Sequence, residues 1–422
     1  MSVESLTSCL EARLSTALHW LKRLVDLNSF TANPLGVDRV VEVTAEMFEE
    51  LGFKAERVAS EHAGYGHHLF LTRPGTSSGR PVVLVTHSDT VFPPEEEARN
   101  DFRWMEAPAE GRIYGPGTVD IKGGTVLIWM VLHALREIAP DEFERTNWLV
   151  AANASEEVIA ADFAQRTKDR CPAGARAALV FEGGPRLDGG WQIVTARKGR
   201  AEFRITARGR GAHAGSSHAE GVNAVVALAH ITPSVAAITD YGRDLTVNVA
   251  TIRGGTVLNR VPHEAELALE VRAFEPALLT HSEAIMRRLI AENAGPAVLS
   301  LDRLGFTSAW PADERTMGLF RHWEAAAHDL GLRTVPIRRG GLSDANYLAD
   351  LGPTLDGLGP SGANAHCSEH SPAEGKVPEF VEPDSFVPKA AMNVLAVLHL
   401  LGTGQDAPPP CTGSSPAHTA PS

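Results

Sequence analysis

The chain has 422 residues, of which 43% are hydrophobic and 22% are charged, the composition of a soluble globular protein. This length exceeds one ordinary domain and favours about two. A formal net charge of −13, without any long basic run, argues against a nucleic-acid-binding protein.

The cysteines and the N-terminus indicate the compartment. Cys9, Cys171, Cys367 and Cys411 are widely scattered and form no CxxC pair, which favours a reducing environment. Residues 1–9 lack the basic and apolar regions of a secretory signal. No apolar run approaches the roughly 20 residues that span a bilayer. We therefore predict a cytoplasmic protein with no membrane or nucleic-acid partner.

The first half of the chain alternates predicted helices with predicted strands. Apolar spacing predicts helices at residues 8–27, 36–51 and 125–135. Short strands are expected at 53–58 and 68–71, and fully apolar strands at 81–87, 147–153 and 177–181. This alternation predicts an α/β domain, with a mixed, mostly parallel sheet and helices on both faces.

From about Ala196 the pattern changes. Strands and helices are expected in the order β-α-β-β-α-β, at 201–207, 221–238, 245–252, 265–271, 277–293 and 297–304. This order is the split βαβ unit of a ferredoxin-like α+β domain. We predict that residues 196–309 form this domain, inserted between two segments of the main domain at 1–195 and 310–401.

The α/β pattern returns after residue 310. Helices are expected at 317–330 and 385–401, with a strand at 334–338 and an apolar segment at 355–358. Residues 402–422 are rich in Pro, Ser, Thr and Gly, which predicts a disordered tail.

Asp120 occupies an unusual position for a charge. It follows Gly115-Pro-Gly117 and precedes Gly123-Gly124 and an apolar helix. A carboxylate held between a stiff turn and a buried helix requires a positive partner, which suggests a metal ion.

Further candidate ligands follow the apolar strands. His87 ends one strand, and Asp89 leaves the backbone on the same side, where it could bind the other ring nitrogen of a metal-bound histidine. Glu156 and Glu157 follow a second strand, and Glu182 follows a third. Taken singly, His87 would be a locally capped histidine and the glutamate pair a solvated helix start. Together with His366 in a Gly- and Pro-rich loop, they gather at the carboxyl edge of one sheet, where ligands bind.

Six motifs in order resemble the zinc-dependent glutamate carboxypeptidase, aminoacylase and deacylase family of di-zinc amidohydrolases. The resemblance covers roughly residues 10–400. The motifs are Thr86-His-Ser-Asp-Thr-Val91, Gly115-Pro-Gly-Thr-Val-Asp-Ile-Lys-Gly-Gly124, Glu156-Glu157, Arg197-Lys-Gly199, Ala212-His-Ala-Gly215 and Gly340-Gly-Leu-Ser-Asp344.

The resemblance implies two Zn²⁺ ions per chain and a role for each matching residue. Asp120 would bridge the ions, with His87 and Glu182 on one and Glu157 and His366 on the other. Glu156 would be the general base, and Asp89 would support His87. Zinc lowers the pKa of its water to roughly 7 and polarises a carbonyl.

The resemblance also implies substrate contacts and a homodimer formed through the inserted domain. His213 resembles the histidine that reaches across the dimer to the tetrahedral oxyanion, although a turn histidine is the simpler alternative. Asn259 and Arg272 resemble substrate contacts, and Arg272 could equally be an exposed sheet arginine. Gly341 and Ser343 match a loop that lines the substrate pocket, or form a plain turn.

Glu182 and the loop 355–366 most resemble the glutamate carboxypeptidase branch. Three features depart from the family: Asn153-Ala-Ser precedes the glutamate pair without an acidic residue, no Gly-Ser turn follows it, and Gly183-Gly184 follows Glu182 in place of the more usual proline. We expect a hydrolase for the amide bond of small N-acyl or aminoacyl acidic amino acids, including dipeptide-like substrates. An N-acetyl or N-succinyl amino acid deacylase is the first alternative. A non-catalytic relative that binds amino acids or peptides is the second.

Overall fold

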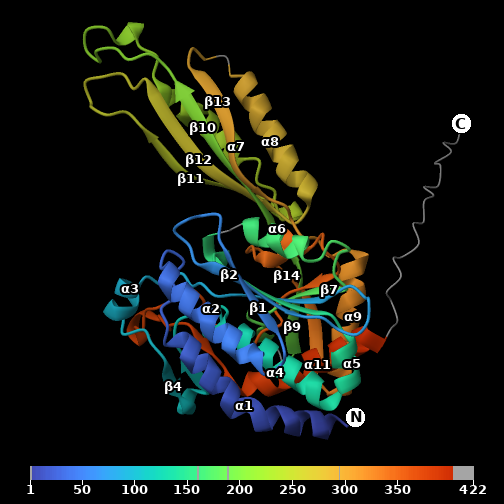
Figure 1. The fold of residues 1–422 in the computed structure, drawn as a ribbon. Coiled ribbons are helices and arrows are strands. Elements are labelled where there is room, and N and C mark those ends of the chain that lie inside the picture. The colour runs from blue at the N-terminus through green and yellow to red at the C-terminus, as the bar shows by residue number, and fades with distance from the viewer. Residues whose placement is uncertain (1, 159–160, 188–189, 294, 403–422) are drawn as a thin grey trace, which may run out of the picture.

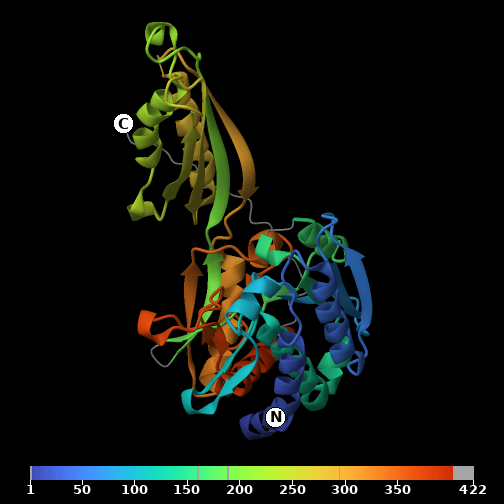
Figure 2. The same cartoon turned by 90° about the vertical axis from the view of Figure 1, so that its left-hand side faces the viewer.

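The computed structural model describes residues 2–402, apart from residues 159–160, 188–189 and 294. The expected tail therefore lies, from residue 403 onward, outside the described residues. The chain forms a large main part and a smaller second part that stands beside it (Figure 1). The chain passes directly from strand β9 (Gly190–Arg197) in the main part into β10 (Gly199–Arg208) in the second (Figure 2).

The main part is built on a six-stranded mixed sheet in the order β1-β2-β6-β3-β7-β15. The strands from β6 to β15 run parallel, and β1 and β2 are antiparallel to their neighbours. This is the predicted α/β sheet. The strands are β1 (Lys54–Ala59), β2 (His67–Arg73), β6 (Trp148–Asn153), β3 (Val82–His87), β7 (Ala177–Val180) and β15 (Thr354–Leu355).

Helices cover both faces of this sheet, as predicted. Alternate residues of β3 show why: Val82 and Leu84 join one apolar core, whereas Val83 and Val85 join another. The larger core lies under α1 (Val3–Val25), α2 (Pro34–Glu49), α4 (Lys122–Ile138), α9 (Glu314–Asp329) and α11 (Phe386–Gly402). The smaller core lies under α6 (Ala161–Asp169) and α10 (Asp344–Leu348).

Two smaller sheets flank the main one. β14 (Arg333–Arg339) pairs in parallel with β9, which in turn pairs with β8 (Arg186–Leu187). The predicted strand at 334–338 therefore exists, but it belongs to this separate sheet and not to the main one. The other sheet has the order β16-β17-β5-β4, with bounds Gly362–Ala363, Phe380–Val381, Arg112–Tyr114 and Met105–Ala107.

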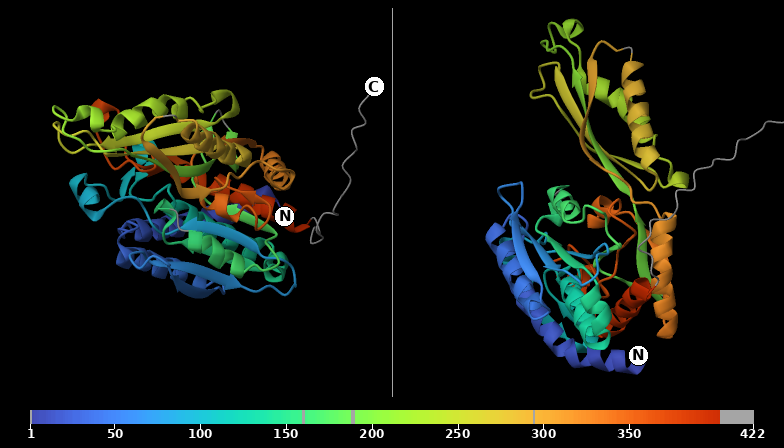
Figure 3. Two further views of the ribbon diagram at one scale, coloured as in Figure 1. Left: turned by 90° about the horizontal axis from the view of Figure 1, so that it is seen from above. Right: turned by 45° about the vertical axis from the view of Figure 1, so that its right-hand side comes forward.

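The second part has the predicted β-α-β-β-α-β order. Its antiparallel sheet, β11-β12-β10-β13, is covered on one face by two helices (Figure 3). The inward residues Ala201, Phe203, Ile205 and Ala207 of β10 pack there, because alternate residues of a strand share a face. The other elements are α7 (Ala224–Ala236), β11 (Thr246–Gly254), β12 (Glu264–Ala273), α8 (Pro276–Ala291) and β13 (Val298–Thr307).

The expectation that no apolar run reaches membrane-spanning length is wrong in one place. Residues Pro383–Gly402 form a 20-residue helical segment with a mean hydropathy of 1.4, which meets the length and composition of a membrane span. The segment is 67% buried inside the fold, where α11 packs against α9, α4 and α1. Its apolar character is that of a core helix.

Candidate metal centre

The five expected ligands converge at one edge of the main sheet. His87 ends β3, and Glu157 and Glu182 follow β6 and β7. Because these strands are parallel, their carboxyl ends meet at the same edge. Asp120 comes from the turn before α4, and His366 comes from the loop after β16.

The five side chains form two groups that share Asp120. In each group, one ligand atom from every residue lies within 4.8 Å of the others: His87, Asp120 and Glu182 in one group, and Asp120, Glu157 and His366 in the other. The two carboxylate oxygens of Asp120 face different histidines. Oδ1 lies 3.1 Å from His87 Nε2, and Oδ2 lies 3.3 Å from His366 Nε2. This is the arrangement that a bridging carboxylate requires.

His87 is oriented through its other ring nitrogen. Nδ1 lies 3.0 Å from the backbone carbonyl oxygen of Asp89 and 3.4 Å from its carboxylate. Because a carbonyl oxygen only accepts hydrogen bonds, Nδ1 carries a proton, so the neutral ring would offer the lone pair of Nε2 to a metal ion. That lone pair faces Asp120 and Glu182, as a metal ligand needs.

The Asp89 carboxylate binds the loop that carries the glutamate pair. Its two oxygens accept the backbone N–H groups of Glu156 at 3.1 Å and Glu157 at 3.2 Å. The Thr31 hydroxyl donates to it at 2.7 Å. Asp89 therefore supports His87 mainly through its carbonyl oxygen, and its side chain fixes Glu156 and Glu157 relative to β3.

The electrostatics of the cluster calls for added positive charge. Burial raises the pKa of Glu157 and Glu182, and the nearby Asp120 charge raises both further. Burial would also raise the pKa of Asp120, but hydrogen bonds with His366 and His87 lower it overall. Hydrogen bonds with Asp120 and Glu157 raise the pKa of His366 to about 11.

Three carboxylates and two imidazoles are a donor set that suits divalent metal ions. With neutral histidines, the set carries a formal charge of −3, which two divalent cations would more than balance. Both histidine Nε2 atoms already point at the shared carboxylate. The residues present therefore fit a pair of metal ions bridged by Asp120.

Glu156 lies beside the cluster. Burial raises its pKa well above the ordinary value, and the charges of Glu182 and Asp344 raise it further, while His87 lowers it. A carboxyl group with a raised pKa is a stronger base than an ordinary carboxylate, which favours the transfer of a proton to it. This is the property expected of a general base.

The Gly341 loop is held by a buried ion pair that the sequence analysis does not predict. Arg197 Nε donates to Asp356 at 2.6 Å, and its Nη1 donates to the carbonyl oxygen of Gly341 at 3.1 Å. The Ser343 hydroxyl donates to the same Asp356 carboxylate at 2.8 Å and caps α10. Gly341 is exposed, whereas Ser343 is buried and its side chain is turned inward onto Asp356.

Arg272 lies near this loop. Its guanidinium pairs with Glu270 at 2.9 Å and donates to the carbonyl oxygen of Gly340 at 3.3 Å. In the sheet it stands opposite Arg200, near the start of β10. Part of its hydrogen-bonding capacity is therefore taken by Glu270.

His213 and Asn259 are neighbours, but they lie far from the metal residues of their own chain. The carbonyl oxygen of Asn259 accepts the N–H of Ala214 at 2.9 Å. Both follow the far ends of their strands, at the end of the second part away from the main part (Figure 1). A strand rises about 3.3 Å per residue, so β10 places Arg208 roughly 30 Å from Gly199. His213 Nδ1 accepts two backbone N–H groups at 3.1 Å, which leaves Nε2 for another partner.

Glu379 is a further buried group behind Asp120. It has no exposed surface, and one of its oxygens accepts the N–H groups of Val119 and Asp120. No local pattern singles out Glu379. Asp356, in contrast, directly follows the buried strand β15. Glu182 was selected because it follows a buried strand, and the same criterion could have selected Asp356.

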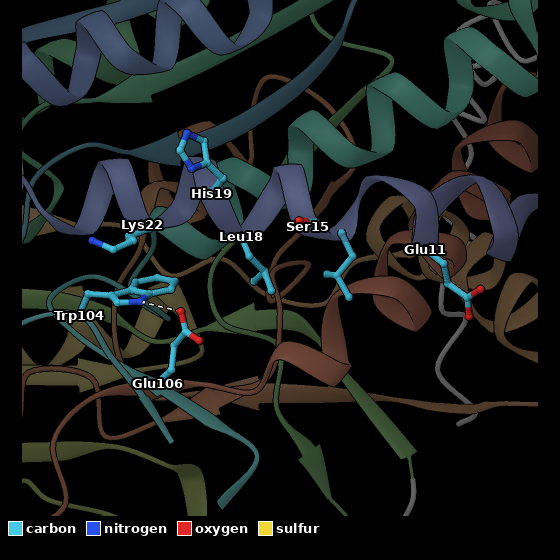
Figure 4. A pocket seen from close by; sticks show the side chains of 8 residues that line it. Glu11, Ser15, Leu18, His19, Lys22, Trp104 and Glu106 are labelled. Carbon is cyan, nitrogen blue, oxygen red and sulfur yellow. Dashed lines mark hydrogen bonds between the residues drawn. The ribbon is translucent and has the colours of Figure 1, made fainter. Parts of the chain in front are cut away.

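A hollow of about 590 Å³ lies away from the metal residues, between α1 and the β4 segment (Figure 4). Its lining combines apolar with polar and charged side chains: Glu11, Leu14, Ser15, Leu18, His19, Lys22, Trp104 and Glu106. Trp104 Nε1 donates to Glu106 at 3.1 Å. Neither of the two metal-ligating groups found among the described residues lies in this hollow, so size alone does not identify the site.

Known proteins resemble both parts of the chain. A family model described as a peptidase dimerisation domain matches residues 195–295. Carboxypeptidase G2 from Pseudomonas sp. (strain RS-16) is 27% identical over 356 residues, which is 82% of this chain and 82% of that protein.

Solved structures have the same fold. Aminopeptidase PepT from Bacillus cereus ATCC 10987 matches with a TM-score of 0.73 and 21% identity, over 92% of this chain and 98% of that one. A Bacillus subtilis protein described as a dinuclear metal binding peptidase from the M20 family matches with a TM-score of 0.65 and 14% identity. That match covers 92% of this chain and 99% of that one.

Proposed function

We propose that the chain is a member of the M20 family of metallopeptidases and that it hydrolyses the amide bond of N-acyl or aminoacyl acidic amino acids with two zinc ions. The observation that carries this proposal is the pair of ligand groups sharing Asp120, with Glu156 beside them. The similarity to carboxypeptidase G2 supports the carboxypeptidase-like branch.

The metal ions, when bound, supply Lewis acidity that polarises the scissile carbonyl and lowers the pKa of water. Glu156 takes a proton from the attacking water on its carboxylate and delivers it to the leaving amine nitrogen. Asp89 keeps Glu156 in place by accepting its backbone N–H. The His87 Nδ1 proton stays on the carbonyl oxygen of Asp89, so the ring keeps one orientation.

The proposal includes a homodimer in which each copy supplies His213 and Asn259 to the other's site. Two observations support it: the match to a peptidase dimerisation domain, and the distance of His213 from the metal residues of its own chain. The edge strand β11 and the loop after it also expose apolar side chains, with Ile252 at 49% and Leu258 at 102% of full exposure.

We propose a cytoplasmic location. Cys9, Cys171 and Cys367 are free thiols in the described part of the chain, which is consistent with a reducing compartment.

Metal removal followed by a substrate panel tests the proposal. Purified protein is treated with a chelator, reloaded with Zn²⁺ and assayed on N-acetyl-, N-succinyl- and aminoacyl-glutamate, with the metal content measured. We expect the metal-free protein to be inactive and Zn²⁺ to restore amide hydrolysis. A chain that holds about two metal ions and cleaves no member of a broad N-acyl amino acid panel would contradict the proposal.

A further inference from the structure

A cavity of about 330 Å³ opens beside the metal residues. Asp120 and Glu182 form part of its wall, so a substrate held at the metal centre can extend into it. The remaining lining residues are Val119, Gly183, Pro185, Arg339, Gly362, Ala363, Asn364 and Ala365. Among the described residues of this lining, Arg339 is the one with a cationic side chain.

Arg339 ends β14, where it lies beside Arg197 of β9. The side chain is partly buried, and no hydrogen bond, ion pair or aromatic contact of its guanidinium is found within the described residues. A guanidinium carries five N–H donors in a planar fork, and burial without partners is costly. The donors of Arg339 are therefore available to a ligand in the cavity.

The other arginines near the site are already paired. Arg197 is bound to Asp356 and to carbonyl oxygens of the Gly341 loop. Arg272 is bound to Glu270 and to the carbonyl oxygen of Gly340. Neither can turn its full fork toward a substrate without giving up a carboxylate.

The charges around Arg339 do not neutralise it. Asp356 is taken by Arg197 and Ser343, and the carboxylates of Asp120 and Glu182 are assigned to metal. Lys389 lies nearby: its buried Nζ has no hydrogen-bond partner within the described residues and lies 5.0 Å from the Trp191 ring. Burial, with help from the charge of Arg339, lowers the pKa of Lys389 to about 7. Lys389 is thus partly neutral near pH 7, and the positive charge that faces the cavity is that of Arg339.

We propose that Arg339 binds a second carboxylate of the substrate and makes the enzyme selective for dicarboxylic substrates, an inference that rests on the proposed amide hydrolysis. The first carboxylate is the α-carboxylate of the released amino acid. The second belongs either to an acidic side chain of that amino acid or to a dicarboxylic acyl group such as succinyl. In both cases the planar fork of Arg339 forms two parallel hydrogen bonds to the carboxylate.

Two matched substrate pairs distinguish the sources of this carboxylate. Comparing hydrolysis of N-acetyl-glutamate with that of N-acetyl-glutamine tests the carboxylate on the amino acid side. N-succinyl-alanine against its succinamide analogue changes the charge on the acyl side. We expect the wild type to prefer the charged member of one pair, and that pair identifies the side that faces Arg339.

The variants Arg339→Met and Arg339→Gln test the residue. We expect kcat/KM on the charged substrate to fall about 10- to 100-fold, mainly through KM, with little change on the neutral partner and with unchanged metal content. Arg339→Lys should recover part of the preference. Arg338→Met is the matched control. Arg338 directly precedes Arg339 in β14, and its side chain contacts Asp244 and Phe274. The Arg338→Met variant should keep the charged-to-neutral ratio.

A binding measurement separates this inference from the proposed function. Thermal stabilisation of the Zn²⁺-loaded protein is compared for glutarate and its monoamide, glutaramate. Stabilisation by glutarate that is lost in both Arg339→Met and Arg339→Gln supports the inference even if no amide substrate is cleaved. Two results would overturn the inference. One is a folded variant, Arg339→Met or Arg339→Gln, whose ratio of kcat/KM on charged and neutral substrates equals that of the wild type. The other is such a variant that glutarate stabilises as much as it stabilises the wild type.

Discussion

The carboxylate of Glu379 accepts a hydrogen bond from the backbone N–H of Asp120 at 3.0 Å, across 259 positions of sequence. The same oxygen, Oε1, accepts the N–H of Val119 at 2.9 Å, and Glu379 is fully buried. Glu379 thereby holds the turn that presents the Asp120 carboxylate to both histidines. Its other oxygen, Oε2, has no partner within the described residues.

Replacing Glu379 should disturb the metal centre without touching a ligand. Glu379→Ala leaves two buried N–H groups without an acceptor, which costs about 1–3 kcal/mol for each. We expect a lower melting temperature and weaker metal binding. Glu379→Gln keeps an acceptor oxygen of the same shape and should retain most of the metal, as measured by metal content after dialysis. Equal metal retention in both variants would mean that Glu379 does not position Asp120.

Asp120 and Glu156 should separate metal binding from proton transfer. Asp120→Ala removes the ligand shared by both groups, so metal content and hydrolysis should both be lost. Glu156→Gln keeps the shape and removes the base, so kcat should fall by about 10²- to 10⁴-fold with metal retained. Metal analysis beside initial rates checks both. Loss of metal in Glu156→Gln would contradict the assignment of Glu156 as the base.

The sequence could predict the clustering of the five ligands because most of them follow apolar strands. In a parallel sheet, that position alone brings His87, Glu157 and Glu182 to one edge. Glu379 could not be found this way, because its partner Asp120 is brought near by the packing of β17 against β5. Strand β9 was also not predicted. The change of pattern near Ala196 was interpreted as a domain boundary, whereas β9 continues almost without a break into β10 there.

His68 should make stability depend on pH. It is fully buried: Nδ1 accepts the N–H of Ala154 at 3.1 Å, and Nε2 lies 3.1 Å from Asp162. Burial lowers its pKa below the ordinary 6.5, although Asp162 opposes this shift. The unfolded chain therefore binds a proton at a higher pH than the folded chain does. The stabilisation is complete above the unfolded pKa and is lost as pH falls toward the folded pKa.

Urea unfolding of metal-free wild type and His68→Gln at pH 7.5 and 5.5 measures this contribution. The variant should be less stable at pH 7.5 by about 1–3 kcal/mol, because buried hydrogen bonds are disturbed. The difference between the two proteins should shrink at pH 5.5. The other histidines, including His87 and His366, titrate in both proteins, so their effect cancels in the difference in free energy of unfolding. A difference that stays constant with pH would show that His68 does not titrate in this range.

Complementation between two inactive variants tests whether His213 acts in the partner's site. His213→Ala should lower kcat by about 10²- to 10³-fold, the usual loss for one oxyanion donor, with metal retained. A mixed dimer of His213→Ala with Glu156→Gln has one site in which both residues are intact. Random pairing at equal amounts makes half of the dimers mixed, so unfolding and refolding the two variants together should restore about a quarter of wild-type activity. Each variant refolded alone is the control. Activity that stays at the level of the separate variants, in a mixture shown to be dimeric, would contradict a role for His213 across the interface.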